Sequence, residues 1–266
     1  MRYLVDDLGV QAYGDQWMSP GYGRNPLNGH EVALLPLGVG GFVVADPLDR
    51  TSIHVRPGVY MPNGSWDAVA QAPDGRIYLT GVFCKNVPLF VWNWEGRQAD
   101  VVAELPGMSF FSMDLAPNGC VYLPEYGQNT LIRFNPDRKQ VESCAKFHAF
   151  CTNIRNVFCG TDGWVYLMGI DYSKGEKFLV IAYNPDSNRS IAVAAPPEST
   201  TASPVAWGSL AKDADGRVLV AQSRWGRTHW LELRCGALHD TEQAAIRLTP
   251  DNRPLAFRDG SYIVTV

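Results

Sequence analysis

Short apolar runs, each preceded by an Asp-Gly or Asn-Gly dipeptide, recur along the chain. Five stretches are copies of one pattern: APDGRIYLTG (72–81), APNGCVYLPE (116–125), GTDGWVYLMG (160–169), DADGRVLVAQ (213–222) and FRDGSYIVTV (257–266). These dipeptides tolerate the positive φ of tight hairpin turns, so each copy predicts a turn followed by a β-strand. The run after the turn is almost wholly apolar, which is typical of a strand that is covered on both faces.

The copies return at a nearly constant interval. The dipeptides begin at Asp74, Asn118, Asp162, Asp215 and Asp259, so the steps are 44, 44, 53 and 44 residues. A period in this range predicts a β-propeller, in which each unit forms one four-stranded blade. The fourth runs, such as ADVVAEL (99–105) and QVESCAKF (140–147), mix charged and apolar residues, as expected for the half-exposed outer strand of a blade.

A sixth dipeptide, Asn28-Gly29, begins another unit within residues 26–57. We therefore expect an all-β fold: a single β-propeller domain over residues 1–266, built of four-stranded antiparallel blades, with six blades as the first choice and five as the second. The last unit stops inside its second strand, and RYLVDD (2–7) is the unassigned stretch that would complete it. The N- and C-terminal strands would then close the ring without a free sheet edge. A fragment of a larger ring is the third alternative.

Composition and charge argue against several classes of partner. Lys and Arg number 23 against 27 Asp and Glu, without a block of like charge, so we expect no nucleic-acid partner and no membrane surface. The N-terminus MRYLVDDLGV lacks the apolar run of a secretory signal, and no run reaches the roughly 18 residues of a membrane span. We therefore expect a soluble, cytoplasmic protein. The six cysteines show no CxxC spacing, so we expect them to be small buried side chains.

The stretch VYLPEYGQNTLIRFNP (121–136) resembles one unit of the NHL-type and gluconolactonase-type β-propellers. Their units run from Asp-Gly through an apolar strand, an acidic residue and Gly or Asn to a strand that ends in Asn-Pro or Asp-Pro. Virginiamycin B lyase is similar again. The resemblance covers roughly residues 26–266 and concerns the order of the repeat, so it implies the fold and leaves the chemistry open.

The resemblance does not extend to the active sites of these families. A lactonase-like site needs Glu, Asn and Asp side chains that converge on a divalent metal, and at the starts of the first strands only Asn153 and Asn156 offer amide ligands. A lyase-like site needs a His at these starts. The equivalent positions here hold Trp66, Phe110, Ile154 and Trp207.

Propeller loops that join one blade to the next, or a second strand to a third, are expected on one face around the central channel. Glu125 and Asp171 end equivalent strands of adjacent units, whereas the first unit has Gly81 there and the fourth has Gln222. This break in the repeat favours a site, in which the two carboxylates bind a metal or act as a general base. The alternative, which is more frequent for acidic residues at strand ends, is a solvated loop side chain.

Other side chains on this face are candidates for ligand binding. Three aromatic residues are suited to stacking on a sugar or another planar ligand: Trp66, Trp207 and Trp225. Inter-blade packing is the alternative for the first two, because large apolar residues hold the matching places in other units. The charged candidates are His148, Arg155 and Arg224.

These observations favour a non-catalytic propeller that binds a polar small molecule, a glycan or a protein at its channel mouth, as a recognition or assembly module. The alternative is a metal-dependent hydrolase, lactonase or lyase that acts on a cyclic or sugar-derived substrate. Its metal ligands would be Glu125, Asp171, Asn153 and Asn156, and the candidate cofactor would be a divalent cation such as calcium in the central channel.

Overall fold

The computed structural model describes residues 21–37, 41–55, 66–81, 86–94, 99–174, 177–193, 206–213, 215–224, 227–241, 255–256 and 262–263. The regular elements of the described chain are β-strands, apart from one short 3-10 helix, Tyr172–Lys174. No helix in this part of the chain is long and apolar enough to cross a membrane.

Five four-stranded antiparallel sheets, which we call blades 1 to 5, follow one another along the chain. Blade 1 contains β1 (Gly21–Arg24), β2 (Glu31–Leu37), β3 (Gly41–Asp46) and β4 (Thr51–Val55). Blade 2 contains β5 (Trp66–Gln71), β6 (Ile77–Gly81), β7 (Val87–Trp92) and β8 (Ala99–Leu105). Blade 3 contains β9 (Asp114–Leu115), β10 (Val121–Glu125), β11 (Thr130–Asn135) and β12 (Gln140–Lys146).

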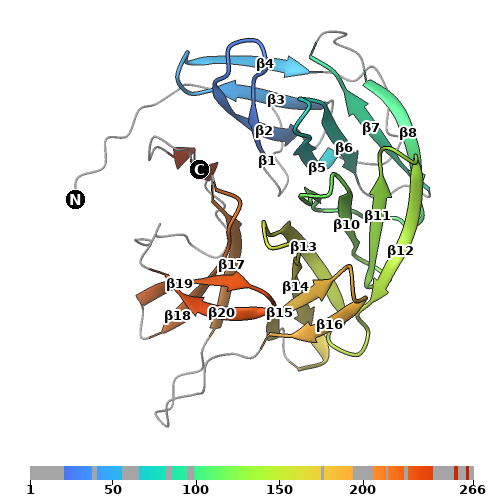
Figure 1. The fold of residues 1–266 in the computed structure, drawn as a ribbon, viewed down its shortest axis with the longest axis vertical. Helices are drawn as coiled ribbons and strands as arrows, with labels where there is room; N and C mark the ends of the chain where they lie inside the picture. The colour runs from blue at the N-terminus through green and yellow to red at the C-terminus, as the bar shows by residue number, and fades with distance from the viewer. Residues whose placement is uncertain are drawn as a thin grey trace.

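Blade 4 contains β13 (Asn153–Cys159), β14 (Val165–Asp171), β15 (Lys177–Asn184) and β16 (Arg189–Ala192). Blade 5 contains β17 (Ala206–Lys212), β18 (Val218–Arg224), β19 (Arg227–Arg234) and β20 (Ala237–Asp240). Figure 1 shows the blades arranged around a common centre. The first strands of successive blades contact one another from β1 to β17, so they line the centre of the ring.

The predicted number of six blades is wrong, and the second choice, five, is confirmed. Among the described residues, the sixth unit supplies β21 (Leu255–Ala256) and β22 (Tyr262–Ile263), which pair as a two-stranded sheet between blade 5 and blade 1 (Figure 1). A turn dipeptide specifies a hairpin of two strands and does not by itself imply a whole blade. The stretch RYLVDD (2–7), predicted to complete the ring, lies outside the described residues.

In the five blades, the turn dipeptide forms the hairpin between the first and second strands, as its sequence predicts. Its glycine has a positive φ, between 76° and 89°, in all five blades. The preceding side chain caps the turn in four of them, because its oxygen accepts a hydrogen bond of 3.0–3.1 Å from the backbone N–H two residues on. These four capping residues are Asn28, Asp74, Asn118 and Asp162.

The apolar second strands are buried between neighbouring blades, as predicted. In β10, Val121 and Leu123 pack with side chains of blade 2, while Tyr122 between them packs with blade 4. Adjacent side chains of a strand point to opposite faces. Each face of blades 2, 3 and 4 is covered by a neighbouring blade. The continuous apolar run is therefore required by burial on both faces.

A charged pair joins the inner strands of three blades. Asp114 of β9 accepts hydrogen bonds from the Cys159 backbone N–H of β13 at 2.7 Å and from the Lys212 ammonium of β17 at 2.8 Å. Burial alone would lower the pKa of Lys212, but its acidic neighbours, chiefly Asp114, together outweigh this effect and raise the pKa above its ordinary value of 10.5. A raised pKa in the folded state means that the pair stabilises the fold at neutral pH and is lost only in strong alkali.

The cysteines follow the prediction in part. Cys120, Cys151 and Cys159 are buried, and Cys144 is half-buried. Cys235 is exposed, because it holds a left-handed position with φ 49° in the two-residue turn between β19 and β20. Cys84 lies outside the described residues.

We predict that Asp114→Asn lowers the free energy of unfolding by about 1–3 kcal/mol at neutral pH, because Lys212 loses its charged partner while Cys159 keeps an acceptor. Asp114→Ala should cost more, since both donors are then left without this oxygen. Chemical denaturation at pH 7 measures the series, with the exposed Asp186→Asn as the control. Equal stability of the two Asp114 variants and the wild type would show that the bridge does not join the blades.

Candidate functional site

The loops on the side where β10 and β14 end form the candidate site. They comprise residues 106–113, 126–129, 147–152 and 172–174, and we call them the mouth-side loops. Backbone hydrogen bonds tie them together: Tyr126 N–H donates to the Ser109 carbonyl at 3.0 Å, Phe147 N–H to Asn129 at 2.9 Å, and Thr152 N–H to Ile170 at 3.0 Å. Loops of blades 3 and 4 are thus bonded to one another and to the strand ends below them.

Glu125, the last residue of β10, is buried and is not a solvated side chain. Its two carboxylate oxygens accept hydrogen bonds from the Met108 N–H at 3.3 Å and from the Gln128 N–H. Gly107 makes this contact possible, because a Cβ on it would lie 2.5 Å from the Glu125 Cγ. The carboxylate therefore braces two mouth-side loops against each other.

Asp171 ends the equivalent strand of blade 4 and is also buried. Its Oδ1 accepts hydrogen bonds from the Ser173 backbone N–H at 3.1 Å and from the Ser173 hydroxyl at 2.5 Å. The adjacent Thr152 hydroxyl accepts from the Tyr172 N–H at 3.0 Å and donates to the Ile170 carbonyl at 2.8 Å. Asp171 and Thr152 together fix the start of the β14–β15 connection.

The start of β13 holds three of the candidate residues: Asn153, Arg155 and Asn156. The Asn153 amide, in the orientation that satisfies its hydrogen bonds, donates to the Tyr126 carbonyl at 2.6 Å and so joins blade 4 to blade 3. Arg155 is half-buried at a register shift, and Asn156 is buried directly after it. The same shift occurs at the start of β5 and of β17, so this bulge belongs to the repeat.

The other candidate residues are exposed, are buried between blades, or have no described side chain. His148 is exposed on a mouth-side loop. Phe110 and Ile154 are fully buried in the clusters between blades, which confirms inter-blade packing at this position of the repeat. The remaining four lie where only the backbone is described, or outside the described residues altogether: Trp66 of β5, Trp207 of β17, Arg224 of β18, and Trp225.

Ligand binding by these residues stays a prediction. The polar groups of Glu125, Asp171 and Asn153 hold loops and strand ends together. An aromatic pair completes this region, because Phe111 and Tyr126 meet edge to face with ring centroids 5.1 Å apart. Both rings are half-buried and come from loops that Glu125 and Ser109 hold in place.

One group of possible metal ligands was not predicted from the sequence. Among the described residues, His30, Asp46 and Asp49 form the group whose ligand atoms all lie within 4.8 Å of one another. They belong to the β1–β2 and β3–β4 turns of blade 1, at the opposite end of the strands from the mouth-side loops. Burial opposes ionisation of Asp46, but hydrogen bonds from Asp49 N–H, His30 and Asn28 outweigh it and lower its pKa.

Comparisons with known proteins place the fold. No family model matches the chain, and no curated protein matches it. Virginiamycin B lyase from Staphylococcus aureus has a TM-score of 0.56 at 13% identity over 89% of this chain and 72% of that one. A gluconolactonase from Xanthomonas campestris has a TM-score of 0.53 at 14% identity over 96% and 82%. The fold is a β-propeller.

The predicted resemblance to lactonase-type and lyase-type propellers is thereby confirmed for the fold alone. An auxiliary nutrient binding protein from Bacteroides thetaiotaomicron is similar too, with a TM-score of 0.56 at 10% identity over 85% of this chain. The chain spans 56% of the length of that protein. These neighbours include a binding protein and two enzymes, so binding and catalysis are both compatible with the fold.

We predict that Glu125→Gln lowers the free energy of unfolding by about 1–2 kcal/mol, because an amide can accept only one of the two backbone hydrogen bonds. The exposed Glu104→Gln on β8 is the matched control and should leave stability unchanged. Calorimetric titration with calcium gives the second readout, in which we expect no change in calcium affinity. Calcium binding that is present in the wild type and lost in Glu125→Gln would contradict the bracing role.

Proposed function

We propose that the protein is a non-catalytic recognition module, which binds a polar small molecule, a glycan or a protein on the surface formed by its mouth-side loops. The observation that carries this proposal is the hydrogen bonding of the two carboxylates that end β10 and β14. Glu125 and Asp171 accept hydrogen bonds from backbone and hydroxyl donors of their own loops. Oxygens used in this way stabilise a rigid surface, and a rigid surface loses little conformational entropy when it binds a ligand.

Exposed apolar side chains on the same surface support recognition. Met108 is 56% exposed, Tyr172 is 41% exposed and Phe178 is 37% exposed, and all three lie in or beside mouth-side loops. The backbone N–H groups of Met108 and Tyr172 are held by hydrogen bonds to Glu125 and Thr152. Apolar and aromatic side chains on fixed backbone are typical of surfaces that stack on sugars or contact proteins.

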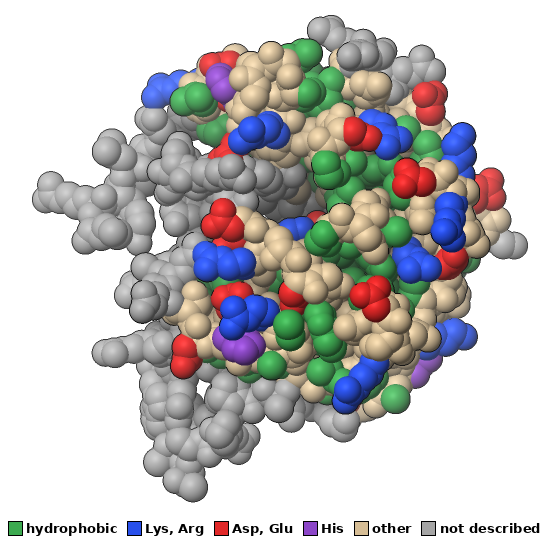
Figure 2. All heavy atoms as spheres, viewed as in Figure 1, with side chains coloured by type: hydrophobic (Ala, Val, Ile, Leu, Met, Phe, Trp, Pro, Cys, Tyr) green, Lys and Arg blue, Asp and Glu red, His purple; other side chains and the backbone are tan. Residues whose placement is uncertain are grey.

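The charge distribution supports a neutral or mixed ligand. On the face seen in Figure 2, acidic and basic side chains of the described residues alternate around the ring, with apolar side chains among them. A nucleic acid would require a continuous basic surface. The proposed ligand is therefore bound through shape, apolar contact and hydrogen bonds.

The triple variant Met108→Ser/Tyr172→Ser/Phe178→Ser tests this proposal. A thermal-shift screen of sugars and polar metabolites, together with a glycan array, should identify ligands of the wild type that the triple variant binds at least roughly tenfold more weakly, a loss of about 1.4 kcal/mol. The control variant, Leu48→Ser/Ile53→Ser/Val101→Ser, removes three exposed apolar side chains outside the mouth-side loops. It should bind as the wild type does.

Ligands that bind the wild type and the triple variant equally would place recognition elsewhere on the molecule. Metal-dependent hydrolysis of lactones by the wild type would contradict a non-catalytic role. Loss of that hydrolysis in Glu125→Gln and Asp171→Asn would assign the chemistry to these carboxylates.

A further inference from the structure

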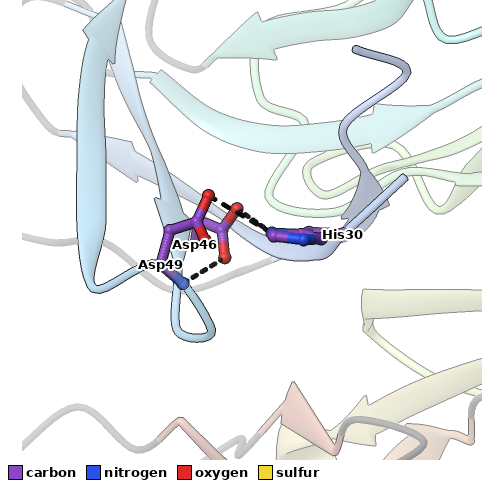
Figure 3. Close-up of side chains that lie close together, drawn as sticks. All are labelled: His30, Asp46 and Asp49. Carbon is purple, nitrogen blue, oxygen red and sulfur yellow. Dashed lines mark hydrogen bonds and ion pairs between the residues drawn. The ribbon is translucent and has the colours of Figure 1, made fainter. Parts of the chain in front are cut away.

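Two turns of blade 1 bring a histidine and two aspartates to one point (Figure 3). The His30 Nδ1 lies 2.9 Å from the Asp46 Oδ2 and 3.4 Å from the Asp49 Oδ2. The Asp46 side chain is only 7% exposed, the His30 side chain is 24% exposed and the Asp49 side chain is 49% exposed. The group is thus fixed on its inner side and open to solvent beside Asp49.

The equivalent turns of other blades provide an internal comparison for Asp46. Asn135 in blade 3 and Asn184 in blade 4 precede the same Pro, and each side-chain oxygen accepts hydrogen bonds of 2.9–3.1 Å from the N–H groups two and three residues on. The Asp46 Oδ1 makes the same two bonds, at 3.0 and 3.1 Å. An amide therefore suffices for the turn, and the second oxygen and the charge of Asp46 serve another purpose.

That second oxygen faces the group, where donors from His30 and Asn28 surround it. The Asn28 Nδ2 lies 3.1 Å from the His30 Nδ1 and 3.3 Å from each of the two Oδ2 atoms. If Nδ1 carries a proton, it donates to the Asp46 Oδ2 at 2.9 Å, while the Asn28 amide donates to the two carboxylates. If Nδ1 carries none, its lone pair faces the Asp46 carboxylate at 2.9 Å. The Asn28 amide cannot turn over without losing the bond that its oxygen accepts from the His30 N–H.

A divalent cation can take the place of these protons, because a deprotonated Nδ1 and two carboxylate oxygens are all ligands for it and lie within 4.8 Å of one another. We propose that His30, Asp46 and Asp49 bind a divalent transition-metal ion, with zinc as the best match. Imidazole and carboxylate are ligands that zinc accepts. Ligand atoms about 2.0–2.2 Å from a tetrahedral zinc lie about 3.3 Å from one another. The two aspartate oxygens lie at 2.9 and 3.4 Å from the His30 Nδ1, close to this value.

Asn28 competes with the ion in this arrangement. Its amide nitrogen is near all three ligand atoms, so the ion binds as the amide moves away. Asp74 and Asp162 cap the same turn in blades 2 and 4, which shows that the turn accepts an aspartate at this position. Asn28→Asp would therefore keep the turn, remove the competing donor and add a fourth ligand oxygen.

Zinc titration of the metal-free full chain by calorimetry tests the site. We expect one zinc ion per chain, bound roughly tenfold or more weakly by Asp46→Asn and by His30→Gln, and roughly tenfold more tightly by Asn28→Asp. Asn118→Asp introduces the same change in the corresponding turn of blade 3, and Asp186→Asn removes an exposed carboxylate from a corresponding turn of blade 4. Both controls should bind zinc as the wild type does.

Two results would overturn the proposal. The first is the absence of zinc binding in both the wild type and Asn28→Asp, which would leave a hydrogen-bonded group without an ion. The second is zinc binding that survives Asp46→Asn and His30→Gln, which would place the ion elsewhere. Asp46→Asn repeats the amide of Asn135 and Asn184, and a thermal melt of each variant confirms that it is folded before its affinity is compared.

Discussion

Burial of the second strand of a blade between its neighbours, as in blades 2, 3 and 4, is the constraint on which the structure depends. Tyr78, Tyr122 and Tyr166 are the large members of these strands, and each is almost fully buried. Tyr166 also donates a 2.6 Å hydrogen bond to Asp162, and Asp162 accepts a second one from the Cys235 N–H of the next blade. Apolar packing and a few polar bridges thus fix each blade against the next and set where the loops emerge.

The sequence was sufficient for the parts of the fold that follow from local chemistry. The glycine of each turn dipeptide and the apolar run after it predict a hairpin and a doubly covered strand, and both are present in five blades. The number of blades was predicted wrongly, because the described residues of the sixth unit form two short paired strands, β21 and β22, and no four-stranded blade. The local sequence pattern does not determine how many strands follow a turn.

The candidate site was predictable only in part. Glu125 and Asp171 do end their strands at the mouth, as the repeat implied, but the direction of a carboxylate depends on donors that local sequence does not specify. Glu125 turns toward the backbone of Met108 because Gly107 leaves room for it. The sequence does contain a signal for the group at His30, because Asp46 stands at a position of the repeat where two other blades have asparagine.

The central claim is that the mouth-side loops form one braced, rigid surface. Hydrogen–deuterium exchange of the native protein tests it most directly, through the amides of Tyr126, Phe147 and Thr152, which donate to backbone carbonyls of neighbouring loops and strand ends. The account predicts that these amides are protected as strongly as those in the middle of β10 and β14. Exchange as fast as that of an open, solvated loop would contradict it.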